Sequence, residues 1–193
     1  YSLFATGIHR HDYVNCGIDR ADVLIAIGYN IVEYPPYVWN KDRDKKIIHV
    51  DFAEAAVDNY YNPDVEVIGD ISDALRQLGE KIPGKKNGAT FGAIREFLVK
   101  KLALDFRGTY PPTPQEVVWH VRNVLAEDDI LALDNGIYKL WFARLYKTYQ
   151  PNTFLVDNAL ATMGAGLPSG IAAKMLNPGK KVLAVVGDGG FMM

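Results

Sequence analysis

Short apolar runs recur along the chain, and each leads into a turn that contains glycine, an acidic residue or asparagine. The six runs cover residues 21–28, 45–52, 65–70, 130–136, 152–158 and 182–187. A continuous apolar run rich in β-branched residues and bounded by turn residues is typical of a strand covered on both faces of a sheet. The pattern therefore predicts six strands, three in each half of the chain.

Stretches with helical spacing lie between these runs. Residues 71–82 carry apolar side chains on one face, and Asp70 or Ser72 is placed to cap the N-terminus of this helix. Residues 93–106 are also amphipathic. The apolar face of that stretch is Ile94, Phe97, Leu98, Leu102 and Phe106. Thr113, Pro114 and Glu116 form a capping-box signature that predicts a third helix. Strands alternating with helices predict parallel α/β sheets.

Two chain-breaking segments divide the sequence. Residues 83–92 are polar and glycine-rich, and residues 109–114 contain three prolines. We therefore expect two partial parallel-sheet α/β domains, at residues 1–84 and 113–193, joined by a linker with a helix at residues 85–112. The sequence starts at Tyr1 and stops just after Asp188, so we interpret it as a fragment at both ends.

Composition narrows the class of protein. The 193 residues carry a formal net charge of −2, and no basic stripe indicates a nucleic-acid partner. No apolar run reaches the length of about 18 residues that spans a bilayer. The single cysteine, Cys16, excludes an internal disulfide and favours a reducing, cytoplasmic location. We interpret Cys16 as a small buried hydrophobe.

The first half offers only weak candidates for a site. Gly28 and Asp51 lie at strand ends, where parallel sheets bind ligands, so a nucleotide-like ligand is one interpretation. A turn glycine and a helix-capping aspartate are the other, which we favour because no GxGxxG motif follows these strands. The aromatic connection at residues 28–45 is either a functional loop or a lid packed on the sheet edge. His120 is interpreted as a packing or surface residue.

The run that ends at Gly187 leads into the strongest candidate site. Asp188 follows the strand, and Gly189 and Gly190 leave backbone N–H groups uncovered. A diphosphate binds such N–H groups, and it attracts Mg²⁺, which prefers carboxylate and phosphate oxygens. In isolation, these four residues are also compatible with a plain tight turn.

Two more turns follow neighbouring predicted strands, and in a parallel sheet all three converge on one edge. The turns read LDNG, VDNALATMG and VVGDGG. The ATMG segment can present backbone groups to an aromatic ring, while Met163 supplies a polarisable apolar side chain beneath it. Core filling is the alternative role for Met163. Gly164, Gly166 and Gly170 indicate close backbone approach to a neighbour or to a cofactor.

The stretch from LDNGIYKLWF through ATMGAGLPSG to VVGDGGFMM resembles the cofactor-binding domain of thiamine-diphosphate enzymes, in particular acetolactate synthase large subunits. RADVLIAIGYNIVEYPPYVWN and KKIIHVDF resemble the central domain of the same family. The resemblance implies that Asp188 binds the metal, Mg²⁺. It also implies three sets of cofactor-binding residues: Gly187, Asp188, Gly189 and Gly190 around the diphosphate; Ala161, Thr162 and Met163 beside the pyrimidine; and Gly136, Ile137 and Tyr138 in the loop that closes over the diphosphate.

The resemblance further implies the reaction. In that family the bound cofactor forms an ylid that attacks a 2-oxo acid. The expected reaction joins two pyruvates into 2-acetolactate with loss of CO₂, in a homo-oligomer, a dimer or tetramer. No catalytic residue is assigned in this chain, because the family's catalytic glutamate belongs to a further domain. The fragment alone is expected to be inactive.

The sequence departs from the family pattern in the loop at residues 136–138. Several alternative functions therefore stay open. Ile137 and Tyr138 follow Gly136, where many acetolactate synthases carry glutamine or serine and then histidine. The GYNIVEYPP stretch is more similar to the FAD-free catabolic branch, so FAD is not expected. The alternatives are another 2-oxo acid enzyme of the superfamily (an oxidase, a decarboxylase or a glyoxylate carboligase), an inactive binding fragment, and a generic nucleotide-binding α/β domain.

Overall fold

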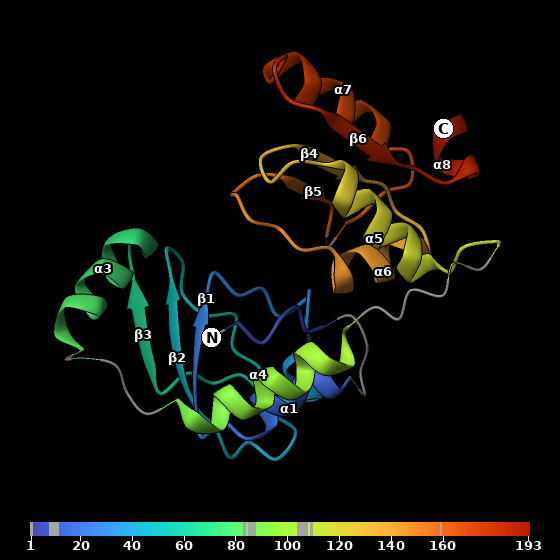
Figure 1. Ribbon diagram of the computed structural model, residues 1–193. Coiled ribbons are helices and arrows are strands. Elements are labelled where there is room, and N and C mark those ends of the chain that lie inside the picture. Colours follow the sequence, from blue (N-terminus) through green and yellow to red (C-terminus); the bar gives the residue numbers. More distant parts are fainter. Residues whose placement is uncertain are drawn as a thin grey trace. The chain divides into compact units, whose positions relative to one another are not determined.

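The structure is a computed structural model in which the chain forms two compact units, Tyr1–Lys101 and Leu102–Met193 (Figure 1). The described residues are 2–7, 12–82, 84, 88–103, 108, 110–158 and 160–193. Each unit contains a three-stranded parallel sheet accompanied by helices, as the alternating pattern predicts. The predicted fold class, two partial parallel-sheet α/β domains, is confirmed.

The sheet of the first unit has the order β1-β2-β3, with β2 in the centre. Its strands are β1 (Val23–Ile27), β2 (Lys46–Asp51) and β3 (Val65–Ile68). In the parallel register Ile48 lies opposite Ile25 of β1 and Val65 of β3. The helices of this unit are η1 (Tyr13–Asn15), α1 (Cys16–Asp19), α2 (Pro36–Trp39), α3 (Ile71–Lys81) and α4 (Ala89–Lys101).

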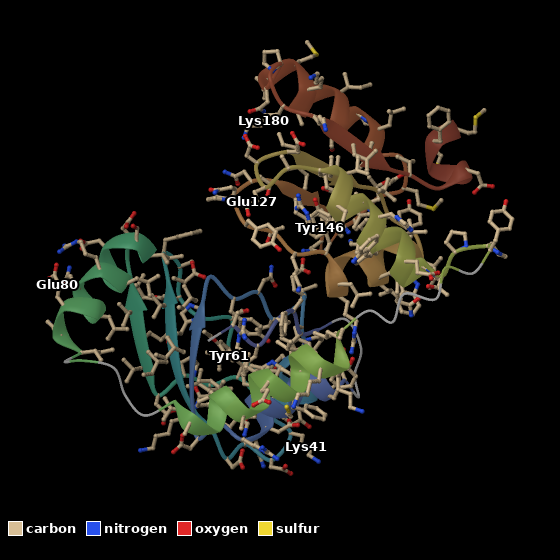
Figure 2. The ribbon with its side chains drawn as sticks, viewed as in Figure 1. Lys41, Tyr61, Glu80, Glu127, Tyr146 and Lys180 are labelled. Carbon is tan, nitrogen blue, oxygen red and sulfur yellow. The ribbon has the colours of Figure 1, made fainter. Side chains whose placement is uncertain are left out.

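One face of this sheet carries an aromatic core that the connection at residues 28–45 helps to build. Trp39, Ile47 and Tyr61 are buried together, and Tyr61 is completely inaccessible (Figure 2). The indole Nε1 of Trp39 donates to the Tyr29 hydroxyl at 3.1 Å, and Nδ1 of His49 lies 2.9 Å from the Tyr61 hydroxyl. The aromatic connection therefore packs on the sheet, which supports its interpretation as a lid.

The opposite face of the same sheet is apolar and exposed. Val23, Ile25 and Ile27 of β1 are 45–46% exposed, and Val65 and Val67 of β3 are 50% and 39% exposed. The prediction that β1 is covered on both faces is therefore wrong for this unit. This face is buried at Val50 of the central strand, which lies opposite Ile27 and Val67, but its cover does not reach β1 and β3 in full. Exposure along β1 therefore alternates from one residue to the next.

The helices of the first unit follow their sequence signals in part. Asp70 caps α3 by accepting a hydrogen bond from the Asp73 N–H at 2.8 Å. Helix α4 begins at Ala89, four residues before the predicted start, and it packs Ile94 and Leu98 against Val14. Contacts thus group α4 with the first unit, whereas the domain boundaries at residues 84 and 113 stay predictions. Phe106, predicted on the same helix face, lies outside the described residues.

The sheet of the second unit has the order β5-β4-β6 and is covered on both faces. Its strands are β4 (Ile130–Leu133), β5 (Phe154–Val156) and β6 (Val182–Val185). Its helices are α5 (Pro114–Val124), α6 (Tyr138–Leu145), α7 (Gly166–Leu176) and α8 (Asp188–Met192). Figure 1 shows α7 beside β6 on one side of the sheet, and α5 and α6 on the other.

Close packing explains the two covered faces. Leu131 and Leu133 of β4 are buried against Val118 of α5 and Phe142 of α6. On the other face, Gly170 lets α7 approach so closely that an added Cβ would lie 3.2 Å from the Ala184 methyl group. Every residue of β4 is buried, as a strand in the centre of a two-sided sheet should be.

The predicted capping box at the start of α5 is confirmed. The Thr113 side chain accepts from the Glu116 N–H at 3.3 Å, and the Glu116 carboxylate accepts from the Thr113 N–H at 2.7 Å. Pro114 occupies the first turn, where its missing N–H costs no hydrogen bond. Among the described helices, none combines the length and the apolar character that crossing a membrane requires.

Candidate functional site

Three turns lie at the carboxyl ends of the parallel strands of the second unit, and direct contacts join them. The Gly187 N–H, after β6, donates to the Tyr138 hydroxyl at 3.0 Å. The Gly164 N–H, in the turn before α7, donates to the Asp134 carboxylate at 3.0 Å. The methyl group of Met163 lies 3.4 Å from where a Cβ on Gly189 would stand. The structure thus brings together the three turns that the sequence singles out.

Tyr138 connects the turn after β4 with the turn after β6. It is the first residue of α6, and its ring lies directly over Gly136, where an added Cβ would overlap ring carbon Cε1. A Cβ on Gly187 would lie only 3.2 Å from the same atom. Gly136 is therefore needed to make room for this ring, and Gly187 gives it a close but tolerable contact. Burial raises the pKa of the Tyr138 hydroxyl, the Gly187 N–H opposes that rise, and the charge of Asp134 adds to it.

Asp134 is a central residue of the site that the sequence analysis does not single out. Its side chain is completely buried at the end of β4. In the described part of the chain its partners are backbone N–H groups, including those of Asn135 and Gly164. Burial disfavours its charge, but the N–H groups of Asn135, Gly164, Gly166 and Ala165 together outweigh burial and lower the pKa of Asp134.

The glycines around Asp134 have their explanation in this carboxylate. A Cβ on Gly166 would lie 2.6 Å from the Asp134 Cβ, and a Cβ on Gly190 would overlap its carboxylate oxygen. Gly164 adopts a φ of +89°, a conformation that favours glycine. Of the two interpretations left open for Gly164, Gly166 and Gly170, these distances support close approach to a protein neighbour.

A network of polar side chains holds the segment between β5 and α7. The Asn135 amide Nδ2 donates to the Thr162 carbonyl at 2.6 Å, and the Lys139 ammonium donates to Asn135 Oδ1 at 2.8 Å. Lys139 also donates to the Asp157 carbonyl. One turn of α6 and the residues just before it therefore hold the two ends of residues 157–162. The sequence carries the signal in its DNG turn, but it does not say which carbonyls the asparagine reaches.

The predicted pyrimidine-binding residues form an exposed edge of this site. Ala161 and Thr162 are exposed, and Met163 is 47% exposed. The Thr162 carbonyl already accepts from Asn135, and the Met163 carbonyl accepts from the Thr162 hydroxyl at 3.2 Å. Among the described residues, none donates a hydrogen bond to the Ala161 carbonyl. That carbonyl is therefore free to accept a hydrogen bond from a ligand.

Asp188, the predicted metal ligand, opens α8 and faces solvent. Gly187 precedes it in extended backbone, with φ −77° and ψ 163°. Within the described ranges, no group of three or more His, Cys, Asp or Glu side chains stands ready to bind a metal. One carboxylate beside uncovered glycine backbone is a donor set suited to a cation that a phosphate ligand also binds. The residues present thus fit a Mg²⁺-diphosphate, with Asp188 as a carboxylate ligand.

The remaining loop residue, Ile137, is 75% exposed at the N-terminus of α6. Gly189 is exposed as well, and Met163 is the neighbour that an added side chain would meet. All ten residues predicted to bind the cofactor therefore lie on these three turns or at the helix starts that follow them. Their individual roles stay predictions.

The weaker candidates of the first unit have hydrogen-bond partners within that unit. Gly28 has a φ of +58°, and its N–H donates to the Val50 carbonyl at 3.0 Å. Asp51 accepts from the Phe52 N–H at 2.7 Å. Gly28 is therefore a turn residue, as predicted. The helix-capping role predicted for Asp51 is wrong, because β3 follows β2 with no helix in the described residues 52–64 between them, and Asp70 caps the next helix, α3. Cys16 is half-buried beside the Val14 cluster, and His120 is exposed with its ring edge-on to Trp119.

Two parallel α/β units, the second with glycine-rich turns gathered at the carboxyl edge of its sheet, are the arrangement of an α/β protein that binds a phosphate-containing cofactor. The chain belongs to the thiamine pyrophosphate enzymes: residues 1–78 match their central domain, and residues 134–193 match their C-terminal TPP-binding domain. The predicted family is confirmed, and the C-terminal match includes all three turns.

Curated relatives place the chain among acetolactate-synthase-like proteins. It is 31% identical over 192 residues to acetolactate synthase of Bacillus subtilis, covering 96% of this chain and 34% of that protein. It is 33% identical over 181 residues to the catabolic acetolactate synthase of Raoultella terrigena, covering 90% and 32%. A putative thiamine pyrophosphate-containing protein of B. subtilis, YdaP, is 32% identical over 180 residues, covering 91% and 31%. The chain spans about a third of the length of these relatives.

Proposed function

We propose that the full-length protein is a thiamine-diphosphate-dependent carboligase that condenses two pyruvates to 2-acetolactate with loss of CO₂. The observation that carries this proposal is the convergence of the DNG, ATMG and GDGG turns on one sheet edge. The acetolactate synthases among the relatives support the choice of reaction.

The roles of the residues follow from their places on this edge. Asp188 would bind Mg²⁺ through its exposed carboxylate, and the backbone of Gly189 would lie open to a diphosphate. The free carbonyl of Ala161 would accept a hydrogen bond from the pyrimidine amino group. Met163 would pack its thioether against the cofactor. When bound, thiamine diphosphate supplies a nucleophilic carbon that adds to a 2-oxo acid.

The surrounding residues of this chain orient these groups. Tyr138 fixes the turn that carries Gly187 and Asp188 through the Gly187 N–H. Asp134 and Asn135 fix the turn that carries Ala161 and Met163. We propose no proton-transferring residue among residues 1–193. By resemblance to the family, the intact protein would act as a homo-oligomer, a dimer or tetramer, without FAD.

Substitution of Asp188 tests this proposal. In the full-length protein, Asp188→Asn removes the carboxylate charge, so we expect a loss of at least about 10-fold in affinity for Mg²⁺-thiamine diphosphate. Acetolactate formation from pyruvate should fall with it and recover in part at high Mg²⁺. Asp128→Asn, a matched change at an exposed residue of the turn before β4, should change neither quantity. Unchanged affinity in Asp188→Asn would contradict the assignment.

A different reaction at the same site is the second candidate function, because the relatives include YdaP, whose name gives the cofactor but not acetolactate synthesis. Another 2-oxo acid enzyme, an oxidase, a decarboxylase or a glyoxylate carboligase, would use the same cofactor site. Product analysis with pyruvate separates these functions: acetolactate supports the carboligase, acetaldehyde supports a decarboxylase, and oxygen consumption supports an oxidase. Glyoxylate as the preferred substrate would support a glyoxylate carboligase.

A further inference from the structure

Two adjacent residues of another turn form hydrogen bonds with the peptide groups on both sides of Met163. The peptide group before it ends in the Thr162 carbonyl, which accepts from Asn135 Nδ2 at 2.6 Å. The peptide group after it carries the Gly164 N–H, which donates to both carboxylate oxygens of Asp134 at 3.0 Å. These two bonds fix the two peptide planes that flank Met163, and with them the direction in which its side chain leaves the backbone.

We propose that Asp134 and Asn135 form a clamp that positions Met163, and that this clamp sets the affinity of the site for the thiamine part of its cofactor. Asp134 and Asn135 are positioning residues, since they act through Met163 and not by contact with the cofactor. The inference rests on the proposed cofactor site and adds to it two residues outside the predicted set.

The two halves of the clamp differ in rigidity. Asp134 is completely buried. Its Cβ and backbone leave no room for a side chain at Gly166, and its carboxylate leaves none at Gly190. It therefore holds its side of Met163 as part of the core. Asn135 is half-buried, and its Oδ1 is fixed in turn by the Lys139 ammonium at 2.8 Å. That contact orients the amide, so that Nδ2 is the atom that faces Thr162.

The clamp can affect cofactor binding only if binding depends on the direction of the Met163 side chain. Met163 is 47% exposed and lies against Gly189, so its side chain stands between the turn that carries Ala161 and the turn that carries Asp188. An unbranched thioether has three rotatable bonds and fills many shapes, so the backbone must supply the constraint that the side chain lacks. Two hydrogen bonds to the flanking peptides supply it.

Asn135→Ala in the full-length protein is the first test, because it removes one half of the clamp and leaves the buried half in place. Loss of one hydrogen bond predicts a decrease of about 5-fold in affinity for thiamine diphosphate with Mg²⁺, measured by calorimetry. Affinity for inorganic pyrophosphate with Mg²⁺ should fall much less, because that probe lacks the thiamine part that Met163 would contact. Asp134→Asn should lower the affinity for thiamine diphosphate further than Asn135→Ala does.

The matched control is Asn123→Ala. Asn123 also donates from its amide to a backbone carbonyl, that of Trp119 at 2.7 Å, but within α5 and away from the three turns. It should bind both probes as the unaltered protein does. The clamp proposal is wrong if Asn135→Ala binds both probes as tightly as the control. It is also wrong if the substitution lowers the affinity for both probes equally.

A readout without any ligand separates the clamp from the cofactor assignment. With ¹³C-labelled methionine methyl groups, the protein should give a dispersed NMR signal for Met163, assigned through Met163→Leu. In Asn135→Ala and in Asp134→Asn, this signal should move toward the position of a free methionine; an unmoved signal overturns the clamp. If the variants move the Met163 signal but the unaltered protein does not bind thiamine diphosphate, the positioning of Met163 by Asp134 and Asn135 stands, and the proposed function fails.

Discussion

The two sheets of this protein share a parallel, three-stranded design but differ in how they are covered. In the second unit, β4 is buried along its whole length between α7 on one face and α5 and α6 on the other. In the first unit, β1 alternates between half-buried and exposed residues, and every residue of β3 is exposed. Continuous apolar runs encode both sheets. Such a run therefore shows that a strand can be covered on both faces, and the neighbouring elements decide whether it is.

The ends of the strands differ as well. After β1, Gly28 bonds to the adjacent strand β2, and after β2 the Asp51 carboxylate bonds within its own turn. After β4 and β6, Asp134 and Gly187 bond to other turns, and these bonds assemble the candidate site. A polar residue at a strand end thus builds a site where its partners come from a different connection.

The largest contrast concerns core packing in the two sheets. Leu131→Ala, at a completely buried position of β4, should lower the free energy of unfolding by about 2–5 kcal/mol. Ile25→Ala, at a position of β1 that is 45% exposed, should cost less than about 1.5 kcal/mol. Urea unfolding measures both values. Equal losses would show that the exposed face of the first sheet is covered in solution.

Alkaline pH should act on the aromatic core of the first unit. Burial, with smaller effects of Tyr29, Glu66 and Asp51, raises the pKa of Tyr61 from 10.0 to about 12. The unfolded chain then loses this proton near pH 10 and the folded chain only near pH 12, so stability falls across that window. The expected decrease is about 2–3 kcal/mol in the free energy of unfolding.

Urea unfolding at several pH values across this window checks the expected decrease. Tyr61→Phe should abolish the part of the slope that this hydroxyl contributes. Tyr110→Phe, at a residue that is 96% exposed, serves as the control and should keep the slope of the unaltered protein. An identical slope in Tyr61→Phe would contradict the prediction.

The smallest contrast compares two glycines. A Cβ at Gly190 would overlap the Asp134 carboxylate, so Gly190→Ala should destabilise the protein by about 1–3 kcal/mol. Gly79 lies inside α3 with no atom within 4 Å of an added Cβ, so Gly79→Ala should stabilise it by about 0.5–1 kcal/mol. Thermal or urea unfolding should give shifts of opposite sign; shifts of the same sign would refute the contact with Asp134.

The sequence predicts the strands well because apolar runs are their direct signal. Each of the six strands lies inside the predicted range, and the caps at Asp70 and Thr113 are correct. Five of the described helices escape prediction: η1, α1 and α2, with three or four residues each, and α6 and α8. Helix α6 has apolar and aromatic side chains on most of its surface, and α8 is only one turn long, so neither shows a clear amphipathic period.

The site is predicted as a set of turns, but its organising residue is not. Asp134 reads like any acidic residue after a strand, and nothing in the sequence tells whether its carboxylate faces solvent or backbone N–H groups. The glycines hold the missing information, since Gly164, Gly166 and Gly190 all pack around it. A buried carboxylate is thus recognised from the side chains that its neighbours lack.

The ring of Tyr138 over Gly136 and Gly187 has a consequence for how this family can vary. A tyrosine at position 138 forbids any side chain at position 136, because the two would occupy the same space. Alanine or serine at position 136 becomes possible only after a smaller residue replaces the tyrosine, whereas at position 187 a shift of the ring by a few tenths of an ångström makes room. These three positions should therefore change together among homologous proteins, and a library that randomises them one at a time would miss the permitted combinations.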